Sequence, residues 1–178
     1  MFQFVGTAVV IAEARPIVAT ILPNIARYVS VIINAVNLVA TAASVLVLAR
    51  IGRKVLIIWG GLILALIDIG MAICFVFNDW GPSGYIIFAL LLLFIIVFGI
   101  TLGPVVRLYL PEIIPSKLSP YATSMTWLAI SATLVATPFL SEAAGGNPYP
   151  AFFLYGGFTL VCFFINLWLT VDTKGRTR

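Results

Sequence analysis

One stretch decides how this chain folds: Gly103-Pro104-Val105-Val106-Arg107-Leu108-Tyr109-Leu110-Pro111-Glu112-Ile113-Ile114-Pro115-Ser116-Lys117. It closes a long apolar run and opens a short polar loop. The Gly103-Pro104 pair predicts a loosened end to a membrane-buried helix, because proline lacks a backbone donor. Glu112 and Lys117 mark the return of the chain to water. Arg107 lies about one helical turn inside the apolar run, where charge is costly and is usually buried against protein, water or a carboxylate.

The composition is that of an integral membrane protein. Of the 178 residues, 62% are hydrophobic and only 9% are charged, and the mean hydropathy is +1.17. Soluble proteins contain roughly 45–50% apolar residues. Six apolar stretches approach the ~20 residues that cross a bilayer as a helix, and the loops between them are short. We therefore expect an all-α membrane protein, with residues 1–178 forming a single six-helix transmembrane domain.

Turn residues and short charged segments separate the expected spans. The spans cover residues 2–22, 28–48, 55–77, 85–110, 121–140 and 151–171. The first has no basic segment before it and is followed by further spans, so it is typical of a membrane helix and not of a cleaved signal peptide. Glu13-Ala14-Arg15-Pro16 interrupts this span, and its two charges are close enough to neutralise one another.

Basic residues gather in the loops on one side of these six spans. That side holds Arg50, Arg53, Lys54, Lys117, Lys174, Arg176 and Arg178, whereas the opposite loops hold Arg27, Asp79 and Glu142. By the positive-inside rule, the basic side and both termini face the cytoplasm, or the matrix or stroma of an organelle. The sequence leaves the organelle open, with the mitochondrial inner membrane as one candidate.

Several classes of function do not fit this chain. It contains no histidine, and both Cys74 and Cys162 lie in apolar runs, so we expect no metal site. It has no glycine loop followed by lysine for a phosphate and no convergent pair of acids, so we expect neither an enzyme nor a cofactor. The basic residues are scattered through short loops, which argues against nucleic acid as a partner.

Two charged residues lie deep in apolar stretches. Asp68 is near the centre of the third span, and Arg107 is near the end of the fourth. Each needs a partner inside the protein. We expect Arg107 to be a structural anchor, to Asp68 or to an acid of a partner subunit, and a contact with an ion or anion is the alternative.

Four motifs, in order, resemble the sugar porter branch of the major facilitator superfamily: Arg50-Ile51-Gly52-Arg53-Lys54, the segment from Gly103-Pro104 to Pro111-Glu112, Trp127 with Thr137-Pro138, and the tail Asp172-Thr173-Lys174-Gly175-Arg176-Thr177. Their order and spacing match spans seven to twelve of such a porter over essentially the whole chain. The resemblance implies a C-terminal six-span half, which in a working porter rocks against a second half. It also implies an ion-pair network of Arg50 or Arg53 with Glu112 on the cytoplasmic side.

The resemblance further implies a reduced sugar site. Gln3, Asn37 and Trp127 are kept as candidate substrate-binding residues. Other sugar-site positions of the family carry Phe2, Ala8, Arg107 and Thr126 here, and the paired tyrosines of its first span are replaced by Ala12 and Glu13.

This pattern favours a transporter-derived structural or accessory subunit of a larger membrane complex, without sugar transport of its own. The alternative is half of a hexose transporter, which pairs with a separate N-terminal half or with itself. Under either hypothesis the expected partners are the lipid bilayer and other membrane subunits. The small, weakly polar faces of the second and fifth spans need a protein cover.

The expected topology makes the first testable prediction. Because one expected span, residues 151–171, separates residues 141–150 from the tail, Asn147→Cys and Gly175→Cys should react with an impermeant maleimide from opposite faces. Labelling of intact and of inverted vesicles measures this. Reaction of both positions from the same face would show that the topology is wrong.

Overall fold

The computed structural model describes residues 10, 18–19, 23–51, 53–77, 83–113, 115, 117–143, 145–146 and 149–169. These residues form α2 (Pro23–Arg50), α3 (Arg53–Val76), α4 (Ser83–Ile100), α5 (Leu102–Ile113), α6 (Ser119–Ala143) and α7 (Tyr149–Leu169). The expected all-α membrane fold is therefore confirmed. The first expected span falls almost wholly outside the described residues, so the count of six is approximate.

Proline and glycine set several helix boundaries. α2 begins at Pro23, and Pro120 and Pro150 lie in the first turns of α6 and α7, where the missing N–H of proline removes no helical hydrogen bond. α6 ends in a glycine cap. The amides of Gly145 and Gly146 donate to the carbonyls of Glu142 and Ser141 at 3.0 and 2.8 Å. Both glycines have positive φ, as this type of cap requires.

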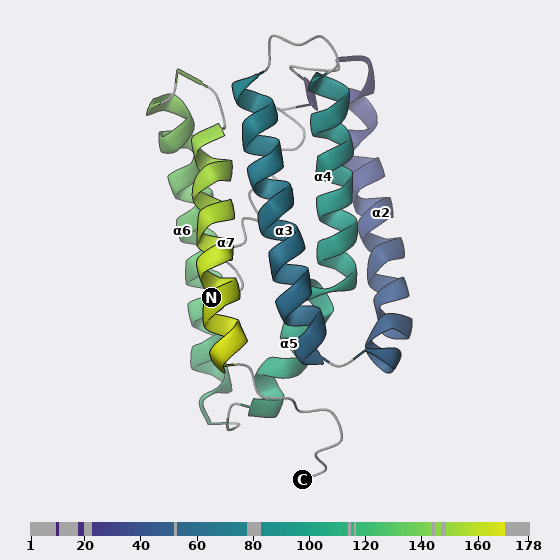
Figure 1. Ribbon diagram of the computed structural model, residues 1–178, viewed down its shortest axis with the longest axis vertical. Coiled ribbons are helices and arrows are strands. Elements are labelled where there is room, and N and C mark those ends of the chain that lie inside the picture. Colours follow the sequence, from purple (N-terminus) through teal and green to yellow (C-terminus); the bar gives the residue numbers. More distant parts are fainter. Residues whose placement is uncertain are drawn as a thin grey trace.

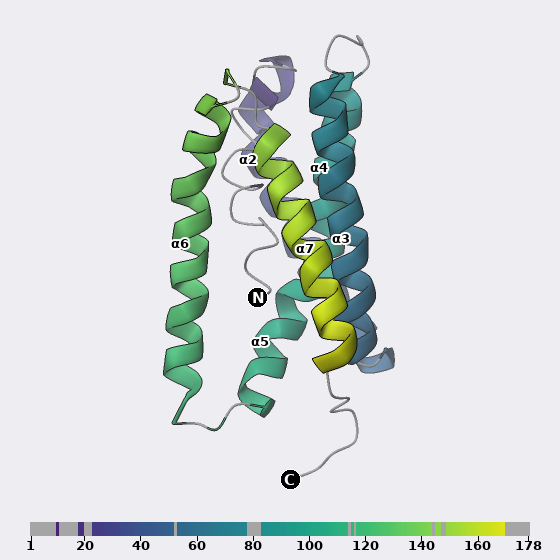
Figure 2. The same cartoon turned by 60° about the vertical axis from the view of Figure 1, so that its left-hand side comes forward.

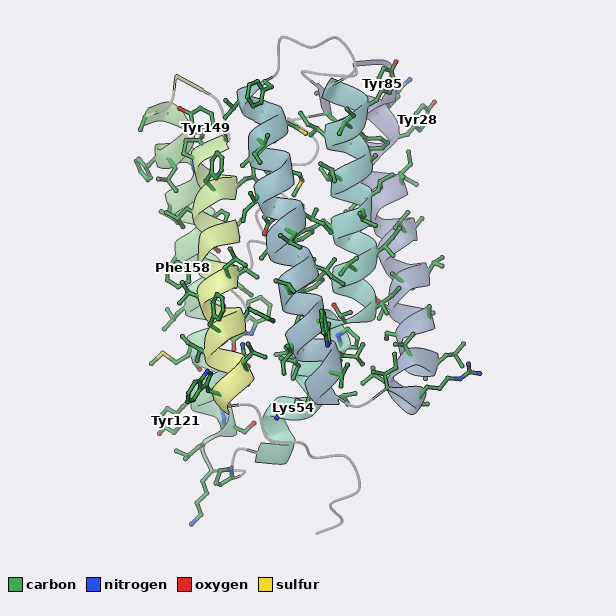
Figure 3. The ribbon with its side chains drawn as sticks, viewed as in Figure 1. Tyr28, Lys54, Tyr85, Tyr121, Tyr149 and Phe158 are labelled. Atoms are coloured by element: carbon green, nitrogen blue, oxygen red, sulfur yellow. The ribbon has the colours of Figure 1, made fainter. Side chains whose placement is uncertain are left out.

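Five helical stretches are long and apolar enough to cross a membrane: Arg27–Arg50, Lys54–Val76, Gly84–Val106, Ser119–Ala143 and Tyr149–Trp168. Tyr28, Tyr85 and Tyr149 lie toward one end of the bundle, and Tyr121 and Lys54 toward the other (Figure 3). Tyrosines at both ends are typical of the two membrane interfaces. The bundle axis therefore runs along the membrane normal.

The fourth span was expected to be continuous from residue 85 to 110, but the structure divides it at Thr101. Thr101 N–H still donates to the Val97 carbonyl at 2.9 Å, whereas the bond from Val105 N–H to the Thr101 carbonyl is stretched to 3.4 Å. Pro104 has no N–H to offer the carbonyl of Ile100, so the helical ladder is interrupted there. α5 consequently leaves the direction of α4 (Figure 1).

α3 is the central helix of the described bundle. In its membrane span 56% of residues are buried, against 17% in α2 and 11% in α6. It packs most extensively on α7 and then on α4, while α2 packs on α4. Figure 1 shows α2 and α6 at the two outer edges. The rings of Phe75 on α3 and Phe152 on α7 stack with centroids 5.4 Å apart.

Glycines bring α3 close to its neighbours. A Cβ atom on Gly156 of α7 would lie 2.8 Å from Ile69 Cγ1, and one on Gly60 would lie 2.6 Å from Thr101 Cβ. The same holds for Gly99 of α4, where a Cβ would lie 2.8 Å from Ala40 Cβ of α2. Small residues at such crossings let membrane helices gain dispersion contacts, since lipid provides no hydrophobic force to press the helices together.

The α3–α7 contact gives a second prediction. Gly156→Leu should lower the free energy of unfolding by ~1–3 kcal/mol, because its side chain would have to displace the α3 backbone. Gly157→Leu is the matched control, since no atom lies within 4 Å of a Cβ at that position. Unfolding by SDS in mixed micelles, followed by circular dichroism, measures the change. Equal losses in both variants would contradict the packing described for Gly156.

Candidate functional site

The described helices expose two kinds of surface. The exposed side chains that the structure describes on α3 and α7 are all apolar: Val55, Trp59, Ile63, Leu66, Ile73 and Val76 on α3, and Phe153, Leu154, Phe158, Val161, Phe164, Leu167 and Trp168 on α7. α2 and α6 differ, because polar side chains interrupt their exposed surfaces. Lipid tails suit the first kind, whereas small polar residues are typical of surfaces that pack against protein within a membrane.

We call the second surface the polar face. It comprises Ser30, Asn34, Asn37 and Thr41 of α2 together with Thr123, Ser124, Trp127 and Ser131 of α6. Its short side chains are largely satisfied by their own helices. Asn34 Nδ2 donates to the Ser30 carbonyl at 2.7 Å, and Thr41 Oγ1 donates to the Asn37 carbonyl at 2.7 Å. These side chains therefore have little hydrogen-bonding capacity left for a ligand or for another protein.

The two candidate substrate residues that the structure describes, Asn37 and Trp127, belong to this face. Asn37 is half-buried where α2 crosses α4, and its Oδ1 would lie 3.3 Å from a Cβ on Gly99. The Trp127 side chain is 64% exposed on α6. The structure does not bring them together, because α2 packs mainly on α4, whereas α6 packs on α7 and α5. Gln3 lies outside the described residues.

The expected ion pair of Arg50 or Arg53 with Glu112 stays a prediction. Arg50 is exposed at the end of α2, and the side chains of Arg53 and Glu112 lie outside the described part of the chain. The turn between α2 and α3 and the C-terminal half of α5 lie toward the same end of the bundle (Figure 1). A half-exposed pair of this kind contributes only ~0.2–1 kcal/mol.

Asp68 is fully buried, and the described residues offer no hydrogen-bond partner to either of its carboxylate oxygens. The register argues against Arg107 as that partner. Gly60 of α3 touches Thr101, and α3 and α4 are antiparallel neighbours. From that level, Asp68 lies eight residues toward one membrane face and Arg107 six toward the other, which separates their α-carbons by roughly 20 Å at 1.5 Å per residue. An arginine and an aspartate side chain do not span that distance together.

A buried polar cluster joins α6 to α7, and the sequence analysis did not identify it. The hydroxyls of Tyr155 and Thr137 lie 2.7 Å apart, and Tyr155 also donates to the Thr133 carbonyl at 3.0 Å. Thr137 Oγ1 donates to the same carbonyl at 2.7 Å. The signal available in the sequence was the Thr133–Thr137 spacing of one helical turn, which places both side chains on one face of α6.

This cluster gives a third prediction. Tyr155→Phe should weaken the attachment of α6 by about 0.5–1.5 kcal/mol, the usual net contribution of a lost hydrogen bond. Amide hydrogen exchange should then become faster in α6 and stay unchanged in α3. Tyr121→Phe is the control, because Tyr121 is 70% exposed. Unchanged exchange in Tyr155→Phe would mean that the cluster does not hold α6 in place.

Comparison with known proteins agrees with this architecture. One curated relative is the putative metabolite transport protein YwtG of Bacillus subtilis, which is 28% identical over 98% of this chain and 39% of its own length. Another is the glucose transporter GlcP of Staphylococcus epidermidis, which is 32% identical over 98% of this chain and 40% of its own length. The chain therefore spans about two fifths of the length of these relatives.

A solved structure of the proton:xylose symporter XylE, bound to 6-bromo-6-deoxy-D-glucose, superposes with a TM-score of 0.85 and 25% identity over 99% of this chain and 39% of that one. An inward-open structure of XylE from E. coli shares the fold, with a TM-score of 0.71 at 21% identity over 97% of this chain and 40% of that one. The family model described as "Sugar (and other) transporter" matches residues 1–178. The chain belongs to this sugar transporter family, within the major facilitator superfamily.

Proposed function

We propose that this chain is a transporter-derived bundle that serves as a structural or accessory subunit of a larger membrane assembly and does not move hexose by itself. The observation that carries the proposal is the polar face. Its two helices are the least buried membrane spans of the described bundle, and they alone expose polar side chains through the middle of a span. A second protein surface is the cover that suits them.

The chemistry of the polar face supports a role other than sugar binding. Hexose recognition needs several converging hydrogen-bond groups around an apolar platform. The Thr126 hydroxyl, at a sugar-site position of the family, donates to the Ala122 carbonyl at 2.9 Å. Among the described residues, Asn37 and Trp127 then remain as sugar-binding candidates, and they lie on helices with different main neighbours, α4 for α2 and α7 for α6.

A second candidate function is half of a hexose transporter. It is supported by the names of the relatives, among them hexose transporter 1 of Plasmodium yoelii yoelii, and by the position of Asn37 and Trp127 on the face that a second bundle would cover. In this case the second half, as another polypeptide or a second copy, supplies the missing hydrogen-bond groups. The two candidates share the interface and differ in whether solute passes through it.

The fourth prediction separates them. The protein purified gently from native membranes should carry stoichiometric subunits in native mass spectrometry. Ser131→Trp on the polar face should release those subunits, because the indole would hold the covering surface away from α6. Val161→Trp is the matched control on the apolar surface of α7, where the side chain is 56% exposed.

Reconstitution into liposomes with labelled hexose provides the transport measurement. We expect no saturable uptake by the chain alone. Saturable uptake that Asn37→Ala and Trp127→Ala abolish and Trp168→Ala leaves intact would overturn the accessory-subunit proposal in favour of the half-transporter. Trp168 is a suitable control, since it is 91% exposed on α7.

A further inference from the structure

Asp68 has no role in the proposed function, yet it occupies the most buried span of the described bundle. Its side chain is fully buried on α3, and neither carboxylate oxygen has a hydrogen-bond partner among the residues described. A Cβ on Gly156 of α7 would lie 3.3 Å from Asp68 Cβ. Asp68 therefore lies at a close contact between α3 and α7, with its side chain shielded from solvent.

The elements packed on α3 offer this carboxylate no opposite charge in their described parts. On α7 the nearest titratable group is Tyr155, whose hydroxyl is bonded to Thr137 and Thr133 of α6. The remaining titratable groups of these elements lie six or more residues along their helices from the level of Asp68: Tyr149 and Cys162 on α7, Tyr85 on α4, Arg107, Tyr109 and Glu112 on α5, and Arg53, Lys54 and Cys74 on α3 itself.

An ionised carboxylate without a partner in such an environment would cost more than the whole stability of a folded domain, so the group takes up a proton instead. We propose that Asp68 is a proton-binding site in the membrane core of this bundle, occupied by a proton when α3 and α7 are packed. Loss of that proton would place a negative charge against the backbone at Gly156. Proton binding and α3–α7 packing therefore favour one another.

The proposal stands independently of the accessory-subunit role and has a direct spectroscopic test. Infrared spectra of the chain in lipid nanodiscs at neutral pH should contain the C=O stretch of a protonated carboxylic acid. Asp68→Asn should remove that band. Glu142→Gln, at an exposed position near the end of α6, should leave it. Absence of the band from the wild-type protein at neutral pH would overturn the proposal.

The dependence of stability on pH gives a second readout. If folding takes up a proton at Asp68, the unfolded state binds fewer protons than the folded state above pH ~4, and stability falls as pH rises. The folding equilibrium constant of the wild type should then fall by up to about tenfold per pH unit between about pH 5 and pH 8, relative to that of Asp68→Asn.

The same measurements identify the opposite case, an ionised Asp68 paired with a cation of the chain. Asp68→Asn would then be destabilised at all pH values in this range, and the relative slope would be absent. Arg15→Gln and Arg107→Gln would each show whether that residue supplies the cation, because removing the second charge should restore stability in the Asp68→Asn background. That pattern would overturn the proposal.

Discussion

The close approach of α3 to its neighbours is the contact on which the rest of the bundle depends. Gly156 lets α7 lie against the backbone at Ile69, and Gly60 admits the side chain of Thr101 at the point where α4 gives way to α5. Apolar side chains are no better solvated by each other than by lipid tails, so dispersion at such short distances is a principal source of helix association. The exposed side chains that the structure describes on α3 are correspondingly all apolar.

The outer helix α6 is attached to the bundle in a different way. α6 makes its described contacts mainly with α7 and α5, and these are few. Hydrogen bonds among Thr133, Thr137 and Tyr155 attach it to α7, together with a small apolar contact of Leu140 with α7. Figure 2 shows α6 standing apart from the other described helices along much of its length. Only 11% of the membrane span of α6 is buried within the bundle.

The break at Thr101 connects local chemistry to the shape of the site. Thr101 Oγ1 donates to the Val97 carbonyl at 2.6 Å, while Pro104 leaves the Ile100 carbonyl without its helical donor. α5 can therefore lean toward the base of α6 (Figure 2). Because α3 and α4 run antiparallel, Asp68 and Arg107 lie on opposite sides of the level at which Gly60 meets Thr101.

The sequence by itself determined the membrane fold, the helix positions and the family. A run of about 20 apolar residues must form a helix in lipid, because only then are its backbone N–H and C=O groups hydrogen-bonded. The turn motifs between the runs can be identified from the residues themselves, without knowledge of how the helices pack. The family, inferred from four motifs, was confirmed by the match over the whole chain. The division of the fourth span was only partly foreseen: Gly103-Pro104 predicted weakness but not its location at Thr101.

Only the tertiary structure decided which charges and polar groups meet. Asp68 and Arg107 seemed suitable partners because a sequence shows which residues are costly in a membrane but not at which depth each lies on neighbouring helices. The Tyr155 cluster was missed for a related reason, since a tyrosine and two threonines from different spans become one site only when α6 and α7 pack. Which faces of each helix are buried in the bundle is likewise known only from the packed structure. Burial depends on how the helices pack against one another, and the amino-acid pattern of a single span does not specify that packing.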